Sequence, residues 1–301
     1  MTRVIFKHVR VRNHKELREQ KIDELSVSRL DSIASTYDSL FNGKMVVFAH
    51  EHIGVRINQY GYYDKDALDL LFLFLNPVLA EFKTGYALDI GANIGNHALF
   101  FSRYFSKVVA FEPHPRIFEL LALNSRLADN IDVYNFGISD QDGVVQLKEN
   151  RLNMGASSMS STNITSLEID VQVKRLESVD VAGSVEFVKI DVEGFEANVI
   201  KGGLSLIEKH RPIIVFEQHK IDFVGNSTET IDYLHELGYQ ICWKEKNVFS
   251  KKSVVRRFQK LMGVLNNRKT EYRIVTGDII PVDNYGMLIA IPKRHYDKFG
   301  F

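Results

Sequence analysis

The sequence has a single cysteine, Cys242, so no disulfide bond can form within the chain. This scarcity fits a reducing compartment. An excess of one charge is also lacking, because 38 Lys and Arg residues balance 38 Asp and Glu residues. Overall charge therefore indicates neither a nucleic-acid-binding protein nor an acidic tail, and any electrostatic attraction has to be local.

Long apolar runs are lacking as well. The longest, residues 70–75, is far too short to cross a bilayer, and the charged N-terminus predicts no signal peptide. The rest of the composition is that of a globular protein, with 45% hydrophobic and 25% charged residues. We therefore expect a cytoplasmic protein, with one large domain or two small ones.

A glycine-containing turn between a strand and a helix organises the rest of the chain. A short apolar run ends near Asp89, Gly91 and Gly95 follow, and a helical pattern begins at Asn96. The glycines permit a tight turn and close packing of the helix on the strand, and the N–H groups of the first helical turn can face a nucleotide-like ligand. Asn93 stands where the dinucleotide-binding signature G-x-G-x-x-G has a glycine.

Strand-like and helix-like segments alternate after this turn. The expected strands are residues 86–90, 108–111, 133–136, 187–190, 213–216, 239–243 and 286–291, and the expected helices are residues 96–106, 115–129, 196–209 and about 229–237. This alternation predicts an α/β fold with a doubly wound parallel sheet. Ligands of such sheets bind at the carboxyl ends of the strands. Those ends carry Asp89, Glu112, Asp191 and Glu217.

The first 59 residues predict an N-terminal α/β extension, an arm followed by a hairpin, ahead of a main domain at residues 60–301. The hairpin is expected from strand-like runs at residues 45–48 and 54–57. Tyrosines within residues 60–63 can either cover a ligand or pack against the core.

Two insertions interrupt the main domain. Residues 138–182 carry two further strand-like runs, 144–147 and 169–173, and a small polar stretch, 153–161, that suits an active-site loop. The second insertion, residues 244–273, holds ten Lys or Arg and two acids. It predicts a solvated insertion, a contact with an anionic membrane surface, or a contact with a polyanionic substrate such as a nucleotide sugar or RNA.

Glu112 strengthens the prediction of a nucleoside ligand. It ends the strand after the glycine turn, where an acid can accept hydrogen bonds from ribose hydroxyls. Asp140, after the third strand, can bond an adenine amino group or merely shape a turn. The ligand is then a nicotinamide dinucleotide or S-adenosylmethionine. No tyrosine has a lysine four residues later, as short-chain dehydrogenases require, which favours the methyl donor.

The sequence resembles the FkbM-type family of S-adenosylmethionine-dependent methyltransferases at residues 88–95, 111–113, 135–140 and, most specifically, 188–196 (VKIDVEGFE). The resemblance covers roughly residues 60–219. It implies a Rossmann-like class I methyltransferase fold of seven strands, the last antiparallel, and O-methylation of a sugar, glycan or related natural product. The expected cofactor-binding residues are Asp89, Gly91, Asn93, Gly95, Asn96, Glu112, Pro113, Asp140 and Asp191.

Methyl transfer from a sulfonium to a hydroxyl needs an aligned acceptor and removal of its proton. Asp191 can hold the donor's amino group or act as the base, and Glu193 and His219 are the other candidate bases. Lys189 lies on the same side of the strand as Asp191 if the strand continues that far. Alternatively, Lys189 and Glu193 form a structural ion pair and His219 is an ordinary loop residue.

A metal ion is a further question. Asp191, Glu217 and His219 occupy positions similar to those of the Mg²⁺ ligands in catechol-type O-methyltransferases. Those enzymes usually carry Asp-Asn after the fifth strand, where this chain has Glu217-Gln218-His219, so we expect transfer without a metal.

Three other functions remain open at this point: a NAD-type oxidoreductase, a non-catalytic nucleotide-binding module, and an RNA methyltransferase. The last is disfavoured because the fourth strand lacks the Asn/Asp-Pro-Pro-aromatic motif of amino-methylating nucleic-acid enzymes. We expect a small-molecule or glycan acceptor and no DNA. The oligomeric state does not follow from the sequence.

Overall fold

The computed structural model describes residues 28, 31, 32, 45–48, 51–149, 167–246, 272–277 and 279–301. Most of the N-terminal arm, the polar stretch 153–161 and residues 247–271 of the basic insertion lie outside the described residues. The predictions made for these segments therefore stay predictions.

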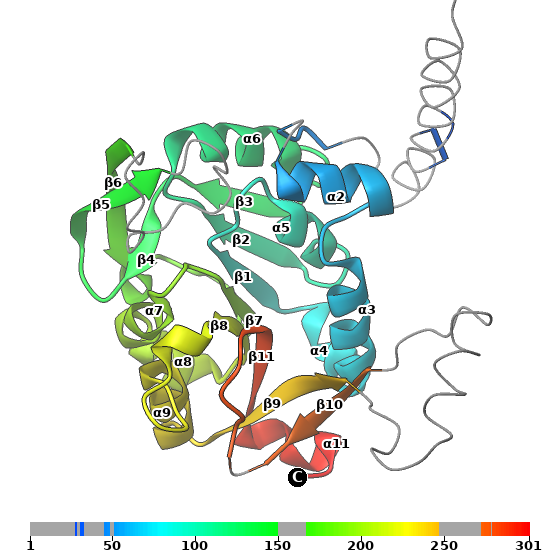
Figure 1. The fold of residues 1–301 in the computed structure, drawn as a ribbon, viewed down its shortest axis with the longest axis vertical. Coiled ribbons are helices and arrows are strands. Elements are labelled where there is room, and N and C mark those ends of the chain that lie inside the picture. Colours follow the sequence, from blue (N-terminus) through cyan, green and yellow to red (C-terminus); the bar gives the residue numbers. More distant parts are fainter. Residues whose placement is uncertain are drawn as a thin grey trace, which may run out of the picture.

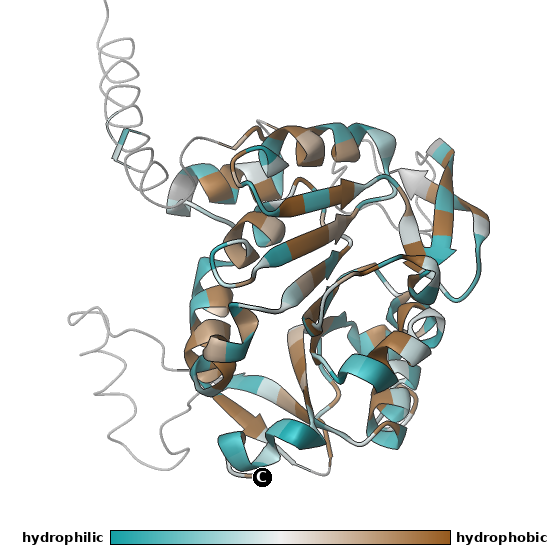
Figure 2. Cartoon of the chain, turned by 180° about the vertical axis from the view of Figure 1, so that it is seen from behind, coloured by the Kyte–Doolittle hydropathy of each residue, from teal (hydrophilic) through white to brown (hydrophobic). Residues whose placement is uncertain are grey.

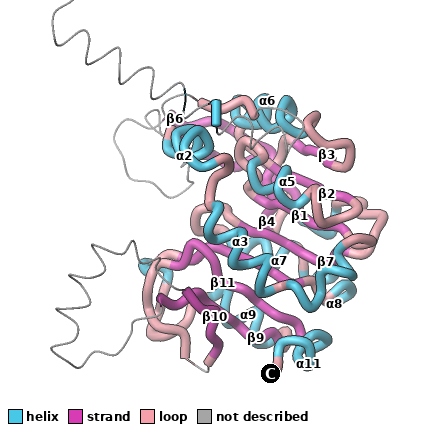
Figure 3. The backbone as a smooth tube through the Cα atoms, turned by 90° about the vertical axis from the view of Figure 1, so that its right-hand side faces the viewer, coloured by secondary structure: helices cyan, strands magenta, loops and turns pink. Residues whose placement is uncertain are grey.

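A single large sheet forms the centre of the molecule (Figure 1). Its strands are β1 (Tyr86–Ile90), β2 (Lys107–Phe111), β3 (Ile131–Tyr134), β7 (Val185–Ile190), β8 (Ile213–Gln218), β9 (Tyr239–Lys246), β10 (Tyr272–Thr276) and β11 (Tyr285–Pro292). Their order across the sheet is β10-β9-β11-β8-β7-β1-β2-β3, and Figure 3 shows this succession from β3 at the top to β9 and β10 at the bottom.

The strand directions confirm the predicted class I methyltransferase sheet. β3, β2, β1, β7 and β8 pair in parallel, while β11 is antiparallel to both of its neighbours, β8 and β9. β10 adds an eighth strand at the edge, antiparallel to β9. The carboxyl ends of β1, β2, β7 and β8 therefore meet at one edge, as the sequence predicts.

Helices cover both faces of the sheet (Figures 1 and 3). One face is covered by α3 (Lys65–Phe74), α4 (Leu79–Phe82), α5 (Asn96–Phe101) and α6 (Pro115–Ser125). The other is covered by α7 (Glu196–Gly202), α8 (Leu204–His210) and α9 (Glu229–Glu236), and α11 (Tyr296–Phe299) follows the last strand. The strands are strongly hydrophobic (Figure 2) because both of their faces are buried. Among the described residues, no helix is long and apolar enough to cross a membrane.

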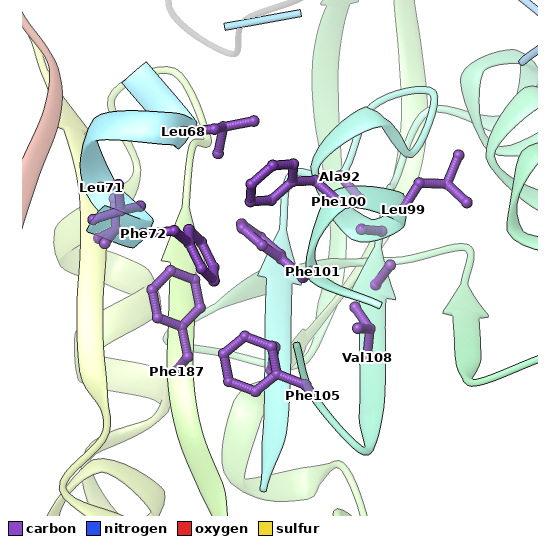
Figure 4. Close-up of a cluster of buried hydrophobic side chains, with 14 of the residues drawn as sticks. Leu68, Leu71, Phe72, Ala92, Leu99, Phe100, Phe101, Phe105, Val108 and Phe187 are labelled. Atoms are coloured by element: carbon purple, nitrogen blue, oxygen red, sulfur yellow. The ribbon is translucent and has the colours of Figure 1, made fainter. Parts of the chain in front are cut away.

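A cluster of phenylalanines fixes α3 and α5 against β7 (Figure 4). The rings of Phe72 and Phe100 have centroids 5.0 Å apart, and those of Phe101 and Phe187 are 5.1 Å apart, both pairs edge to face. Aromatic pairs in this geometry add to the stability that their burial provides. The cluster thereby holds the N-terminal ends of α3 and α5 beside the carboxyl ends of the strands.

The first insertion forms a small sheet of its own, in the order β4-β6-β5. Its strands are β4 (Gly137–Ser139), β5 (Gly143–Glu149) and β6 (Leu167–Arg175), with β5 and β6 antiparallel. The two strands predicted inside the insertion are confirmed.

The predicted N-terminal hairpin is wrong. Residues 45–48 are not a strand, and α2 (His52–Tyr60) replaces the second strand. Ile53 and Ile57, four residues apart, both pack against the core, which is the spacing of a helix rather than a strand. Gly54 permits a close approach, because a Cβ there would lie 2.2 Å from the carbonyl oxygen of Phe48. Burial against the core overrides the local strand preference of these residues.

The helix predicted at residues 196–209 is divided into α7 and α8. The division falls at Gly202 and Gly203, where the chain passes against the insertion sheet. A Cβ on Gly202 would lie 1.9 Å from the carbonyl oxygen of Ser139, so only a glycine allows this contact.

Candidate active site

The glycine turn after β1 is wedged between the ends of β2 and β7. The N–H groups of Gly91 and Ala92 donate to the carbonyl oxygen of Phe111 at 3.0 and 2.9 Å. Gly91 has φ +76°, and a Cβ there would lie 1.8 Å from the carbonyl oxygen of Asp191. Asn93 also has a positive φ, of 52°. Because glycine alone tolerates both the conformation and the contact at position 91, the turn can close tightly over the strand ends.

Glu112 braces this turn from the end of β2. Its Oε2 accepts the N–H of Asn93 at 3.0 Å and its Oε1 accepts the N–H of His114 at 2.8 Å. The side chain is almost fully buried, and burial raises the pKa of Glu112 to about 7. Each carboxyl oxygen can still accept a second hydrogen bond. The predicted contact of Glu112 with ribose hydroxyls stays a prediction.

A cavity of about 280 Å³ opens beside the glycine turn. Among the predicted site residues, those that line it are Gly91, Asn93, Asn96, Glu112, Pro113, Lys189, Asp191 and Glu193. Four predicted residues lie outside the lining: Asp89, Gly95, Asp140 and His219. Asp89 is fully buried, Gly95 begins α5 with φ +89°, and Asp140 is exposed beside β4. The proposed contact of Asp140 with adenine stays a prediction.

Two segments remote from the sheet edge complete the walls of this cavity. Val145, Leu147 and Val171 from the insertion sheet provide an apolar side, and Tyr63 closes the N-terminal side. The Tyr63 N–H donates to Oδ1 of Asn96 at 2.9 Å, and the Asn96 amide donates back to the Tyr63 carbonyl oxygen at 3.2 Å. Of the two predicted roles for these tyrosines, Tyr63 is placed to cover a ligand, while Tyr62 packs in the core.

Lys189 ties the ends of β1 and β7 together. Its Nζ lies 3.0 Å from the carbonyl oxygen of Gly91, 3.4 Å from Oδ1 of Asp89 and 3.2 Å from Oδ2 of Asp191. Burial opposes the charge, but Asp191 and Asp89 outweigh it and raise the pKa of Lys189 above its usual range. Lys189 is therefore a buried ammonium group beside two acidic side chains, and burial still raises the pKa of Asp89 despite this contact.

Three acids gather at the ends of β7 and β8. Asp191, Glu193 and Glu217 each offer a carboxylate oxygen, and these atoms lie within 4.8 Å of one another. Burial and then the charge of Asp191 raise the pKa of Glu217 to about 9. Burial opposes the ionisation of Asp191, but Lys189 and a hydrogen bond from Glu217 lower its pKa. At neutral pH the pair therefore holds one proton, on Glu217, and Asp191 is ionised.

The acidic cluster can be compared with the metal ligands considered above. Glu193, rather than His219, stands with Asp191 and Glu217, while Nε2 of His219 lies 3.5 Å from Oε2 of Glu193. The three carboxyl groups provide oxygen ligands, but the Lys189 ammonium already lies beside Asp191 and Glu217 retains a proton. A divalent cation would have to displace that proton and overcome the repulsion of Lys189.

Glu196 is a site residue to which the sequence assigned no separate role. It is 3% exposed, and its Oε1 accepts the N–H groups of Val192 and Gly194 at 3.3 and 3.2 Å. These bonds hold a turn in which Glu193 and Gly194 have φ values of 53° and 99°. The available signal was its place at the end of the distinctive run 188–196.

His97 and Asp64 form a second polar pair at the site. Nε2 of His97 lies 4.0 Å from Oδ2 of Asp64. Burial and the nearby Lys189 lower the pKa of His97 to about 3, so the imidazole is neutral at neutral pH. Asp64 begins α3, and the strand–helix alternation carried no signal that the start of this helix reaches the site.

A smaller cavity, of about 50 Å³, adjoins the acidic cluster. It shares four lining residues with the larger cavity: His97, Lys189, Asp191 and Glu217. Its other walls come from α3, α5, β8 and β11. The ionised Asp191 and the protonated Glu217 therefore stand where the two cavities meet.

Comparison with known protein families identifies one that matches this sequence. The family described as the methyltransferase FkbM domain matches residues 89–241, just over half of the chain. The match runs from the end of β1 into β9 and so includes the glycine turn, Glu112 and the acidic cluster.

Curated relatives match smaller parts of the chain. The hexuronic acid methyltransferase AglP of Haloferax volcanii is 30% identical over 133 residues, which are 42% of this chain and 53% of that protein. The methyltransferase sdnD of Sordaria araneosa is 26% identical over 154 residues, 39% of this chain and 60% of that protein. The chain thus spans between half and two thirds of the length of these relatives. Among solved structures, an FkbM methyltransferase from Methylobacillus flagellatus KT is 19% identical, with a TM-score of 0.36, over 53% of this chain and 39% of that one.

Proposed function

The chain belongs to the FkbM methyltransferase family, and we propose that it transfers the methyl group of S-adenosylmethionine to a hydroxyl group of a sugar or glycan. The observation that carries this proposal is the position of the Asp191 carboxyl group, which lines both cavities and lies 3.2 Å from the Lys189 ammonium group. A carboxylate in this position can accept the proton of an entering hydroxyl.

The larger cavity suits the methyl donor. Gly91, Asn93 and Asn96 line it at the glycine turn and the start of α5, and Glu112 provides buried acceptor oxygens at the end of β2. Pro113 and Ile117 with the insertion sheet offer an apolar surface for a flat base. Asp191 and Glu193 add negative charge for a cationic donor.

The donor supplies an electrophilic methyl group attached to a positively charged sulfur. Asp191 accepts the proton of the acceptor hydroxyl as the new oxygen–carbon bond forms, and the electron pair of the broken sulfur–carbon bond remains on sulfur. Lys189 keeps Asp191 ionised and in place through its contact at 3.2 Å. Glu217 donates a hydrogen bond to Asp191, so the pair carries one negative charge rather than two at neutral pH.

The choice of a sugar hydroxyl rests on two considerations. AglP, a hexuronic acid methyltransferase, is 30% identical over the part of the chain that it matches. A hydroxyl nucleophile also needs a base, which Asp191 provides.

Family membership favours the methyl donor over a nicotinamide dinucleotide.

The test is direct. The purified protein is incubated with S-adenosylmethionine carrying a labelled methyl group and a panel of neutral, deoxy- and uronic-acid glycosides and nucleotide sugars, and methylated products are identified by mass spectrometry. Calorimetry with S-adenosylhomocysteine and with NAD measures binding separately. We expect binding of the donor product and transfer to at least one sugar. Binding of NAD instead would overturn the proposal, and donor binding without any transfer would indicate a non-catalytic module.

A further inference from the structure

The two cavities extend from Asp191 and Glu217 in different directions along the sheet edge. In the sheet order, β7 and β8, which carry Asp191 and Glu217 at their ends, stand between β1 and β11. The larger cavity extends from this pair towards β1 and β2, where the glycine turn and Glu112 lie. The smaller cavity extends towards β11 and α3. A displacement at carbon requires the entering oxygen and the leaving sulfur on opposite sides of the methyl group, so the acceptor approaches from the side that the donor does not fill.

We propose that the smaller cavity is an acceptor subsite that receives a small apolar substituent near the methylated hydroxyl, namely the C6 methyl group of a 6-deoxyhexose. This inference rests on the proposed function and narrows its substrate class. It differs from what the name of the hexuronic acid methyltransferase suggests.

The cavity has room for a small substituent of the acceptor. A volume of about 50 Å³ compares with roughly 10–15 Å³ for a space that just holds one water molecule. A methyl or hydroxymethyl group fits within such a space. The ring itself would lie nearer the mouth, with a hydroxyl directed at Asp191.

The chemistry of the walls favours a methyl group over a polar one. Apolar residues of α3, α5 and β8 line the cavity from the same side of the sheet: Leu68, Leu71, Phe101 and Val215. An apolar substituent is transferred from water to such a surface with a gain in free energy, whereas a hydroxyl or carboxylate would lose hydrogen bonds to water.

The charges of the walls act against a uronic acid. Asp64 and Asp191 are acidic, and Glu217 would ionise at higher pH. Of the described residues that line the cavity, only Lys189 is a permanent cation, and it is already paired with Asp89 and Asp191. A C6 carboxylate would therefore meet carboxylates without a cation of its own, which is unfavourable in a partly desolvated site.

The substrate test uses glycosides that differ only at C6. In the gluco, galacto and manno series, 4-nitrophenyl glycosides carrying CH₃, CH₂OH or COO⁻ at this carbon are compared by kcat/KM. We expect the 6-deoxy compound to exceed the uronide by at least ~10-fold in the series that is accepted, with the parent sugar between them. A uronide that reacts as fast as its 6-deoxy partner would overturn the inference.

The location is tested by filling the cavity from two of its elements, β11 and α3. Gly286 of β11 and Ala67 of α3 both line it, and a Cβ on Gly286 would meet no heavy atom within 4 Å. Gly286→Leu and Ala67→Leu should each lower kcat/KM for the 6-deoxy glycoside by at least ~10-fold, with the affinity for S-adenosylhomocysteine within about twofold of the original. Calorimetry of the 6-deoxy glycoside against the protein saturated with S-adenosylhomocysteine should show the same loss of affinity.

Gly143→Leu is the matched control. Gly143 is also an exposed strand glycine whose added Cβ would meet nothing within 4 Å, and it lines neither cavity. This variant should behave like the original protein. If both cavity variants retain full kcat/KM and acceptor affinity, the inference fails while the proposed function stands. If donor product binds but no glycoside reacts, the proposed function fails and this subsite assignment fails with it.

Discussion

A buried lysine determines the charge state of the candidate active site. Lys189 contacts Asp89 from β1 and Asp191 just after its own strand, so the loss of its charge would leave these two acidic side chains without a nearby cation. Its position also explains why Asp89 lies outside the cavity although the sequence placed it in the cofactor site. Asp89 instead contacts Lys189, which in turn contacts Asp191 at the cavity.

The base assignment can be tested with Asp191→Asn. The amide keeps the shape of the side chain but cannot take a proton, so we expect kcat to fall by at least ~100-fold. Asp132→Asn is the control, because Asp132 forms an exposed ion pair with Lys107 on the far edge of the sheet. Methyl transfer and S-adenosylhomocysteine affinity are measured for both. Near-normal turnover of Asp191→Asn would rule out Asp191 as the base.

The raised pKa of Glu217 predicts a pH-dependent cost in stability. Between the ordinary value of 4.5 and about 9, the unfolded chain releases this proton while the folded protein keeps it, so stability decreases as the pH rises through this window. Glu217→Gln removes the titration and keeps a hydrogen-bond donor. Its free energy of unfolding should match the original near pH 4.5 and exceed it by a growing margin as the pH rises, up to several kcal/mol at pH 8, as measured by urea unfolding. Parallel pH profiles would contradict the assignment.

Chelation tests the role of the acidic cluster. Because Lys189 and the proton on Glu217 already compensate Asp191, we expect dialysis against EDTA to leave methyl transfer within about twofold of its starting rate. Addition of Mg²⁺ to the dialysed protein provides the comparison. Loss of activity on dialysis and recovery with Mg²⁺ would show that the three acids bind a metal.

At the level of elements, the glycine turn works through its contact with the end of β7. Gly91 and Gly194 both have a positive φ. In Gly91→Ala the added Cβ would lie 1.8 Å from the Asp191 carbonyl oxygen, whereas in Gly194→Ala the added Cβ would have no heavy atom within 4 Å. Gly194→Ala should cost about 1–2 kcal/mol of stability, the conformational cost alone. Gly91→Ala should cost roughly 3 kcal/mol or more and weaken S-adenosylhomocysteine binding. Equal unfolding midpoints for the two variants would show that the contact is unimportant.

Elements with a clear local period could be predicted, and elements defined by distant partners could not. The alternation of apolar strands and helices identified β1, β2, β7 and β8 because each strand is apolar on both faces. The hairpin prediction failed because the backbone of residues 45–48 is bonded to a distant helix rather than to a neighbouring strand. Asn124 of α6 exchanges hydrogen bonds with the N–H and carbonyl oxygen of Val46, at 2.7 and 2.9 Å. No pattern near Val46 reveals a partner 78 residues away.

At the level of the whole molecule, the basic insertion begins at the same sheet edge as the site. β9 runs parallel to β8, so its end, before residue 247, lies at the carboxyl edge. Residues 247–271 carry seven Lys or Arg and one acid. The three sequence-based interpretations of this segment stay predictions.

Deletion of residues 254–268 tests them. With four Lys or Arg removed, binding to vesicles that contain phosphatidylserine should weaken at least ~10-fold, since each such residue contributes about 1 kcal/mol near an anionic surface. Neutral phosphatidylcholine vesicles serve as the control in a co-sedimentation assay. Unchanged binding would favour a solvated insertion, and a loss confined to RNA or nucleotide-sugar binding would favour a polyanionic substrate.

The sequence by itself determined the doubly wound sheet, the glycine turn and the acids at the strand ends, because these depend on residues close together along the chain. Only the tertiary structure decided that the insertion sheet and Tyr63 line the larger cavity, that α3 and β11 line a second one, and that the pKa of Glu217 is raised while that of Asp191 is lowered. Cavities and pKa values depend on burial and on charges from distant segments, so they exist only once the chain has folded.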